Sequence, residues 1–106
     1  MNVDVRTLMA EVKAGLQALY GERLKGVYLF GSYARGEADE ESDVDVLVVL
    51  DRVDRYSEEL DRTSELISAL SLAHGVTISR VFASEQRWRG EQTMFFLNVR
   101  EEAVPV

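Results

Sequence analysis

The side chains best suited to chemistry lie in one short segment, in which a Gly-Ser pair is followed, after ten residues, by two aspartates. Gly31 and Ser32 come directly after the apolar stretch 27–30, and Asp43 and Asp45 introduce a second apolar stretch. Both stretches have the composition of β-strands, so the polar groups are expected at strand ends. Because side chains alternate along a strand, Asp43 and Asp45 should face the same side, with Cα atoms roughly 6–7 Å apart.

The aspartate pair is predicted to bind divalent cations. All residues from 46 to 50 are apolar, which is typical of a strand that is buried on both faces. Two carboxylates at the start of such a strand repel each other unless a cation or hydrogen-bond donors compensate. Oxygen ligands of this kind suit Mg²⁺. Asp43 and Asp45 are therefore candidate metal ligands, and the simpler alternative is that they only mark the start of the strand.

The Gly-Ser turn is predicted to bind phosphate. Gly31 has no Cβ, so a phosphate can approach its backbone, and Ser32 offers a hydroxyl donor at the start of a short predicted helix over 32–35. Arg35 can add a guanidinium to the same phosphates. An exposed arginine that balances the acidic segment 37–45 is the alternative interpretation of Arg35. Gly31, Ser32 and Arg35 are the candidate nucleotide-binding residues.

The segment as a whole resembles the signature of the nucleotidyltransferases of the DNA polymerase β superfamily. The resemblance rests on the Gly-Ser turn, its Ala-Arg-Gly continuation, a serine before the first aspartate and the apolar strand behind the second. Residues 78–88 and 96–102 also look like such proteins, so the resemblance covers most of the chain. At this length, the chain is similar to a minimal nucleotidyltransferase (MNT), of the kind found as the antitoxin of HEPN/MNT toxin–antitoxin pairs.

The resemblance implies a fold, a reaction and a partner. The implied fold is α/β (α+β), a small mixed β-sheet flanked by helices, as in the palm of polymerase β. The implied reaction is Mg²⁺-dependent transfer of AMP from ATP to a hydroxyl of a cognate HEPN-type toxin. In that reaction Gly31 and Ser32 bind the β- and γ-phosphates, and Asp43 and Asp45 are the catalytic residues that hold two Mg²⁺ ions.

One departure from the family pattern concerns a third carboxylate, which many of these transferases carry on the next strand as a metal ligand and base. Alignment of residues 76–79 with that strand places Thr77 at the acidic position, and threonine is not a base at neutral pH. Either the acceptor or a partner supplies the base, or the chain is a catalytically weak or inactive nucleotide-binding module that neutralises the toxin by direct binding. A small-molecule transferase is a more distant alternative, because the chain lacks an additional domain to enclose the acceptor.

Composition predicts one small cytoplasmic domain over residues 1–106. The sequence has no cysteine, which excludes disulfides and thiolate metal sites, and its start has no signal-peptide pattern. No apolar stretch approaches the roughly 18 residues of a membrane span. The net charge of −7 argues against direct DNA or RNA binding. We expect the acceptor to come from another chain.

Hydrophobic periodicity predicts alternating helices and strands. One helix should begin after Asp4 and end at Gly21, and another should begin at Ser57 and end at Gly75. Strands are predicted over 26–30, 44–50 and 76–82, and shorter helices over 84–88 and 92–101. Pro105 is expected only to mark the tail. The apolar cluster 88–97 is predicted either to pack in the core or to dock a partner.

Overall fold

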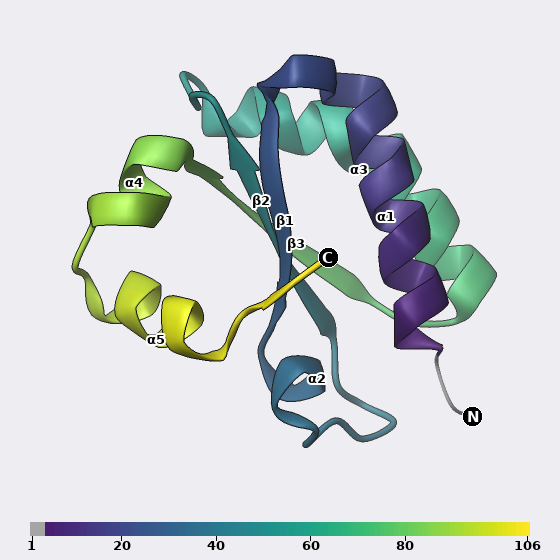
Figure 1. The fold of residues 1–106 in the computed structure, drawn as a ribbon. Helices are drawn as coiled ribbons and strands as arrows, with labels where there is room; N and C mark the ends of the chain where they lie inside the picture. Colours follow the sequence, from purple (N-terminus) through teal and green to yellow (C-terminus); the bar gives the residue numbers. More distant parts are fainter. Residues whose placement is uncertain (1–3) are drawn as a thin grey trace.

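The computed structural model describes residues 4–106 as a four-stranded mixed sheet with helices on both faces (Figure 1). The sheet order is β3-β2-β1-β4; β1 is antiparallel to both of its neighbours, and β2 and β3 are parallel. The predicted α+β fold with a mixed sheet is confirmed. In chain order the elements are α1 (Val5–Tyr20), η1 (Gly21–Arg23), β1 (Leu24–Phe30), α2 (Ser32–Arg35), β2 (Val44–Leu50), α3 (Tyr56–His74), β3 (Ile78–Ser84), α4 (Glu85–Gly90), α5 (Met94–Glu102) and β4 (Val104–Pro105).

The central strand β2 is buried on both faces, as its sequence predicts. One face contributes Val46 and Val48 to a cluster with α1 and α3, and the other contributes Leu47 and Val49 to a cluster with α5. Figure 1 shows α1 and α3 together on one side of the sheet and α4 and α5 on the other. A one-residue slip of β2 would exchange these two sets of side chains, so both cores fix its register.

The helix ends follow the predicted capping residues closely. The Asp4 carboxylate accepts the Thr7 N–H and hydroxyl at the start of α1, and these hydrogen bonds lower the pKa of Asp4. Gly21 is the C-cap of α1, and Gly75 ends α3 in the left-handed conformation, with φ of 63°. Helix α3 begins at Tyr56, one residue before the predicted start.

The predictions for the start of β3 and for Pro105 are wrong. Strand β3 begins at Ile78, not at residue 76, because the Val76 N–H donates to the Ser71 carbonyl and completes the end of α3. Pro105 does not merely mark the tail, since it pairs with Tyr28 of β1 in β4. Proline is tolerated in β4 because this strand lies at the edge of the sheet.

The apolar cluster 88–97 is partly buried and partly exposed, so the core prediction holds for only part of it, and docking stays a prediction. Phe96 is buried against β2, whereas Met94, Phe95 and Leu97 are exposed on the outer face of α5. No helix within residues 4–106 combines the length and the hydropathy needed to cross a membrane.

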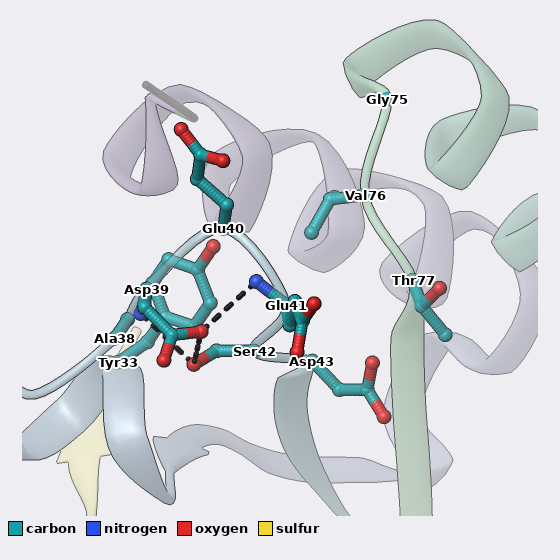
Figure 2. Close-up of a pocket in the computed structure, with 10 residues that line it drawn as sticks. All are labelled: Tyr33, Ala38, Asp39, Glu40, Glu41, Ser42, Asp43, Gly75, Val76 and Thr77. Atoms are coloured by element: carbon teal, nitrogen blue, oxygen red, sulfur yellow. Dashed lines mark hydrogen bonds between the residues drawn. The ribbon is translucent and has the colours of Figure 1, made fainter. Parts of the chain in front are cut away.

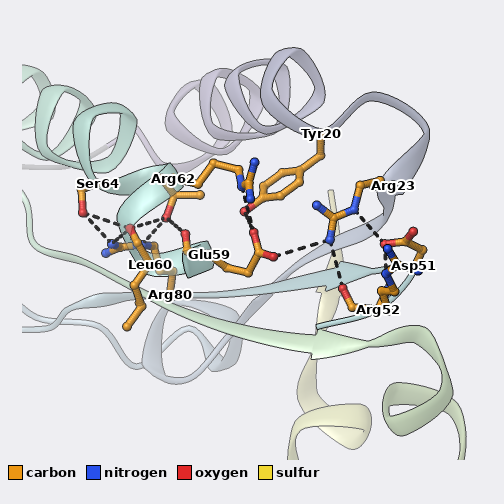
Figure 3. Close-up of polar contacts among 10 residues, drawn as sticks. Tyr20, Arg23, Asp51, Arg52, Glu59, Leu60, Arg62, Ser64 and Arg80 are labelled. Carbon is orange, nitrogen blue, oxygen red and sulfur yellow. Dashed lines mark hydrogen bonds and ion pairs between the residues drawn. The ribbon is translucent and has the colours of Figure 1, made fainter. Parts of the chain in front are cut away.

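A buried carboxylate ties the two long helices together at one end of the sheet (Figure 3). Glu59 of α3 is 3% exposed and accepts the Tyr20 hydroxyl at 2.7 Å. Arg62 and Arg23 lie 3.1 and 3.5 Å from the same carboxylate. Burial and this carboxylate raise the pKa of Tyr20 well above its usual range. Glu59 therefore forms ion pairs with two guanidinium groups and accepts the hydrogen bond of one buried hydroxyl.

Replacing Glu59 should weaken the packing of α1 on α3. Glu59→Ala is expected to lower the free energy of unfolding by about 2 kcal/mol, since it leaves the Tyr20 hydroxyl without its acceptor, while partial exposure of both arginines limits the loss. The exposed neighbour Glu58 is the matched control, and Glu58→Ala should change stability by less than about 0.5 kcal/mol. Urea denaturation measures both values, and equal losses would contradict this account of Glu59.

Candidate active site

The Gly-Ser turn and the aspartate pair meet at one end of the β1–β2 pair. The register places Phe30, the last residue of β1, opposite Asp45. Gly31 follows with φ of 76° and ψ of −156°, a conformation open essentially to glycine alone. A Cβ at Gly31 would lie 2.2 Å from the Asp45 Oδ2. The turn backbone and the carboxylate are thus in direct contact, and a side chain at this position would require the Asp45 carboxylate to move.

The short helix α2 continues the turn and carries Ser32 and Arg35. The Arg35 N–H donates to the Gly31 carbonyl at 3.1 Å, and the Glu37 N–H donates to the Ser32 carbonyl at 2.9 Å. Gly36 ends the helix in the left-handed conformation. Three predicted nucleotide-binding residues, Gly31, Ser32 and Arg35, therefore lie within one turn of chain beside Asp45.

The two aspartates are brought together but differ in environment. Asp43 precedes β2 and is exposed, whereas Asp45 is its second residue and is partly buried. Burial and then the charge of Asp43 raise the pKa of the Asp45 carboxyl, and the nearby Arg35 opposes the shift. The charge of Asp43 therefore disfavours the ionised form of Asp45, in the direction that the sequence predicts.

An open pocket of about 690 Å³ lies next to Asp43 (Figure 2). The acidic loop forms one wall, and the turn before β3 forms the other. Asp39 shapes the loop, because its carboxylate accepts the Glu41 N–H at 2.9 Å and the Ser42 hydroxyl at 3.2 Å. The residues that line the pocket are Tyr33, Ala38, Asp39, Glu40, Glu41, Ser42, Asp43, Gly75, Val76 and Thr77.

Thr77 lies in this pocket together with Asp43, whereas Asp45 is not among the lining residues. Its carbonyl accepts the Val44 N–H at 2.9 Å, and the register of β2 with β3 places Ser79 opposite Asp45. Neither Thr77 nor Ser79 is an acid or a base at neutral pH. Within residues 4–106, no group of three or more His, Cys, Asp or Glu side chains is arranged to hold a metal ion. Asp43 and Asp45 would therefore need further oxygen ligands from a substrate or water.

Glu102 is a residue of this site that sequence reasoning did not identify. Its carboxylate accepts the Gly31 N–H and pairs with the Arg35 guanidinium at 3.1 Å. The first contact joins residues 71 positions apart in the chain. Only the folded sheet brings the end of α5 to this turn, and an acidic pair at a helix end carries no local signal of such a contact.

Because of Asp45, replacing Gly31 by alanine should destabilise the fold more than replacing Gly36, although both glycines have positive φ. Gly36→Ala meets no atom within 4 Å, so it should cost only the backbone penalty of about 1–2 kcal/mol. Gly31→Ala should cost at least about 1 kcal/mol more, because its ψ is also restricted and its methyl group meets Asp45. Chemical denaturation measures both losses. In an Asp45→Ala background the Gly31→Ala loss should shrink, and an unchanged loss would contradict the contact.

Asp45 should also make stability depend on pH. Its pKa is higher in the folded chain than in the unfolded chain, so the folded state binds this proton more tightly. The contribution of Asp45 to stability should then fall as pH rises through its raised pKa, so ionised Asp45 is destabilising at neutral pH. Asp45→Asn is expected to raise the thermal midpoint by a few degrees at neutral pH, and the gain should vanish near about pH 4. The exposed Asp61→Asn is the control, and a gain independent of pH would contradict the assignment.

Comparisons with known proteins agree with this geometry. The sequence model of a family described as nucleotidyltransferase domain matches residues 9–100. A protein of Methanocaldococcus jannaschii that is named as a protein adenylyltransferase is 41% identical over 88 residues, which is 82% of either chain.

Solved structures share the fold. A structure described as a minimal nucleotidyltransferase has a TM-score of 0.62 and 32% identity, with coverage of 99% of this chain and 98% of that one. The crystal structure of a toxin–antitoxin with AMP-PNP has a TM-score of 0.62 at 24% identity, and covers 91% of this chain and 69% of that chain. The second likeness supports the fold alone. Together with the family match, these similarities show that the chain belongs to the nucleotidyltransferase family, as a minimal nucleotidyltransferase of the DNA polymerase β superfamily.

Proposed function

We propose that this chain transfers AMP from ATP to a hydroxyl of a cognate HEPN-type toxin and acts as its antitoxin. The observation that carries the proposal is the contact between the Gly31 turn and the Asp45 carboxylate. In the proposal this backbone binds phosphate and this side chain binds metal. The name of the Methanocaldococcus jannaschii relative, a protein adenylyltransferase, supports a protein acceptor.

Each site residue has a role in this proposal. Gly31, Ser32 and Arg35 bind the β- and γ-phosphates, through backbone N–H groups, a hydroxyl and a guanidinium. Asp43 and Asp45 are the catalytic and metal-binding residues. Their carboxylate oxygens fit Mg²⁺, and the ligands that the protein does not supply would be phosphate oxygens and water. Mg²⁺, when bound, supplies neutralisation of phosphate charge and acidification of the attacking hydroxyl.

The reaction follows from this placement. The acceptor oxygen forms a bond to the α-phosphorus, the bond from the α-phosphorus to the β-phosphate oxygen breaks, and pyrophosphate leaves. The hydroxyl proton passes to a base or to water. Gly31, Ser32 and Arg35 hold the leaving group in place, so most of the protein's contribution is positioning and charge neutralisation.

Two surface features support a protein acceptor over a small molecule. The pocket beside Asp43 is open, so an acceptor can be presented from outside. The outer face of α5 exposes Met94, Phe95 and Leu97, which a docked protein can cover. The acidic loop would favour a partner with a basic surface.

Thr77 favours a second candidate function, a nucleotide-binding module that neutralises the toxin by contact. Neither Thr77 nor the neighbouring Ser79 can act as a base, so turnover would depend on a base from the acceptor or the partner. In this alternative the toxin is bound but remains unmodified. The two candidates therefore differ in one observable, the covalent state of the partner.

Intact mass spectrometry distinguishes the candidates. Incubation of the chain with a HEPN-type partner encoded beside it, ATP and Mg²⁺ should add the mass of AMP to the partner. Asp43→Asn combined with Asp45→Asn should abolish the added mass without unfolding the chain, since it removes like charges as well as metal ligands. A stable complex without added mass would support the binding module instead. Full transfer by the double variant would place the chemistry at other residues.

A further inference from the structure

The carboxylate of Glu102 lies on the turn that the proposed function assigns to phosphate. It accepts the Gly31 N–H, and its two oxygens lie 3.1 and 3.3 Å from the Arg35 Nη1. The side chain is 22% exposed, so the contact is partly shielded from water. Arg35 also pairs with Glu37 at 2.7 Å.

Glu102 and a nucleotide phosphate would use the same donors. A carboxylate and a phosphate are both anionic oxygen acceptors, and the Gly31 N–H is a single donor. The Arg35 guanidinium that faces Glu102 would be needed by the same phosphate. Asp45 contacts Gly31 from another direction, and the charge of Glu102 adds to the raised pKa of Asp45. The Glu102 carboxylate therefore adds a negative charge next to Asp45, and its hydrogen bonds with the Gly31 N–H and Arg35 compensate this charge.

The backbone at Glu102 is held by α5, which ends at this residue, and by the contacts of the residues that follow. The next residue, Ala103, donates its N–H to the Val99 carbonyl at 2.8 Å, and Val104 pairs with Leu29 of β1. The Val106 N–H donates to the Val27 carbonyl at 3.0 Å. The fixed backbone keeps the Glu102 carboxylate at a high effective concentration near the Gly31 N–H and Arg35. Only rotation of the Glu102 side chain can remove it from these donors.

We infer that Glu102 occupies the phosphate subsite of the nucleotide-free chain as an internal competitor, and that a nucleoside triphosphate binds by displacing its side chain from Gly31 and Arg35. The inference rests on the proposed function, because that function places phosphate at these donors. It adds a regulatory contact within the chain, since the Glu102 side chain lowers the apparent affinity for nucleotide while it holds these donors.

Calorimetric titration with inorganic triphosphate and with ATP, each in Mg²⁺, tests the competition. Glu102→Ala should lower the Kd for both ligands by about tenfold, because charge-assisted hydrogen bonds no longer have to be exchanged. Glu101→Ala is the matched control: it removes the same charge from the adjacent, exposed residue and should change the Kd by less than about twofold. An unchanged or higher Kd for Glu102→Ala would overturn the inference.

The Gly31 amide resonance gives a second measurement that does not depend on affinity. In wild type, the hydrogen bond to the Glu102 carboxylate should move this amide proton downfield, and Glu102→Gln, which keeps the shape but removes the charge, should move it upfield. Inorganic triphosphate should change the wild-type signal and release the Glu102 side chain. A Gly31 signal that is the same in wild type and Glu102→Gln would overturn the inference even if a variant bound nucleotide poorly.

The two proposals fail in different ways. Equal binding of MgATP by wild type and Glu102→Ala would overturn the competition and leave the proposed function intact. No binding of MgATP or inorganic triphosphate by either chain would overturn both, because Gly31 and Arg35 would then not form a phosphate site.

Discussion

The pairing of β1 with β2 is the constraint on which the candidate active site depends. Its register sets Phe30 opposite Asp45, so the chain must turn at Gly31 directly against that carboxylate. The register cannot slip, because β2 is buried on both faces and each face has its own apolar core. Two packed cores, formed with α1 and α3 on one face of β2 and with α5 on the other, thereby hold the Gly31 turn against the Asp45 side chain.

Negative charge dominates the surroundings of this turn. Asp45 and Glu102 contact it, the charge of Asp43 acts on Asp45, and Arg35 pairs with Glu102 at 3.1 Å. The raised pKa of Asp45 is the local cost of that arrangement. A site with this charge balance suits a ligand that brings cations with it, as ATP does when it binds together with Mg²⁺. The same balance explains why Glu102 binds the Gly31 N–H and Arg35 instead of extending into water.

Local sequence patterns were sufficient to predict most of the scaffold. Asp4, Gly21 and Gly75 mark helix ends because capping depends on residues that are close in the chain. The run of apolar residues in β2 predicted a strand buried on both sides, and the Gly-Ser turn followed by two aspartates predicted which strand ends would meet. The roles assigned to those site residues stay predictions that the experiments above address.

Features that depend on distant contacts could not be predicted in the same way. Glu102 reaches Gly31 across 71 positions, and β4 exists because the tail finds the free edge of β1. Pro105 argued against a strand on local grounds, yet an edge position tolerates it. The start of β3 was misplaced because Val76 completes the end of α3 through its backbone N–H, a hydrogen bond that side-chain periodicity does not reveal.

We propose that the Gly31 turn and the aspartate pair form one metal-dependent nucleotide site. Calorimetric titration of the wild-type chain with ATP, in Mg²⁺ and again in EDTA, tests it most directly. We expect saturable binding in Mg²⁺ and a large loss of affinity in EDTA, because Asp43 and Asp45 repel the triphosphate when no cation lies between them. Equal affinity for ATP in Mg²⁺ and in EDTA would contradict it.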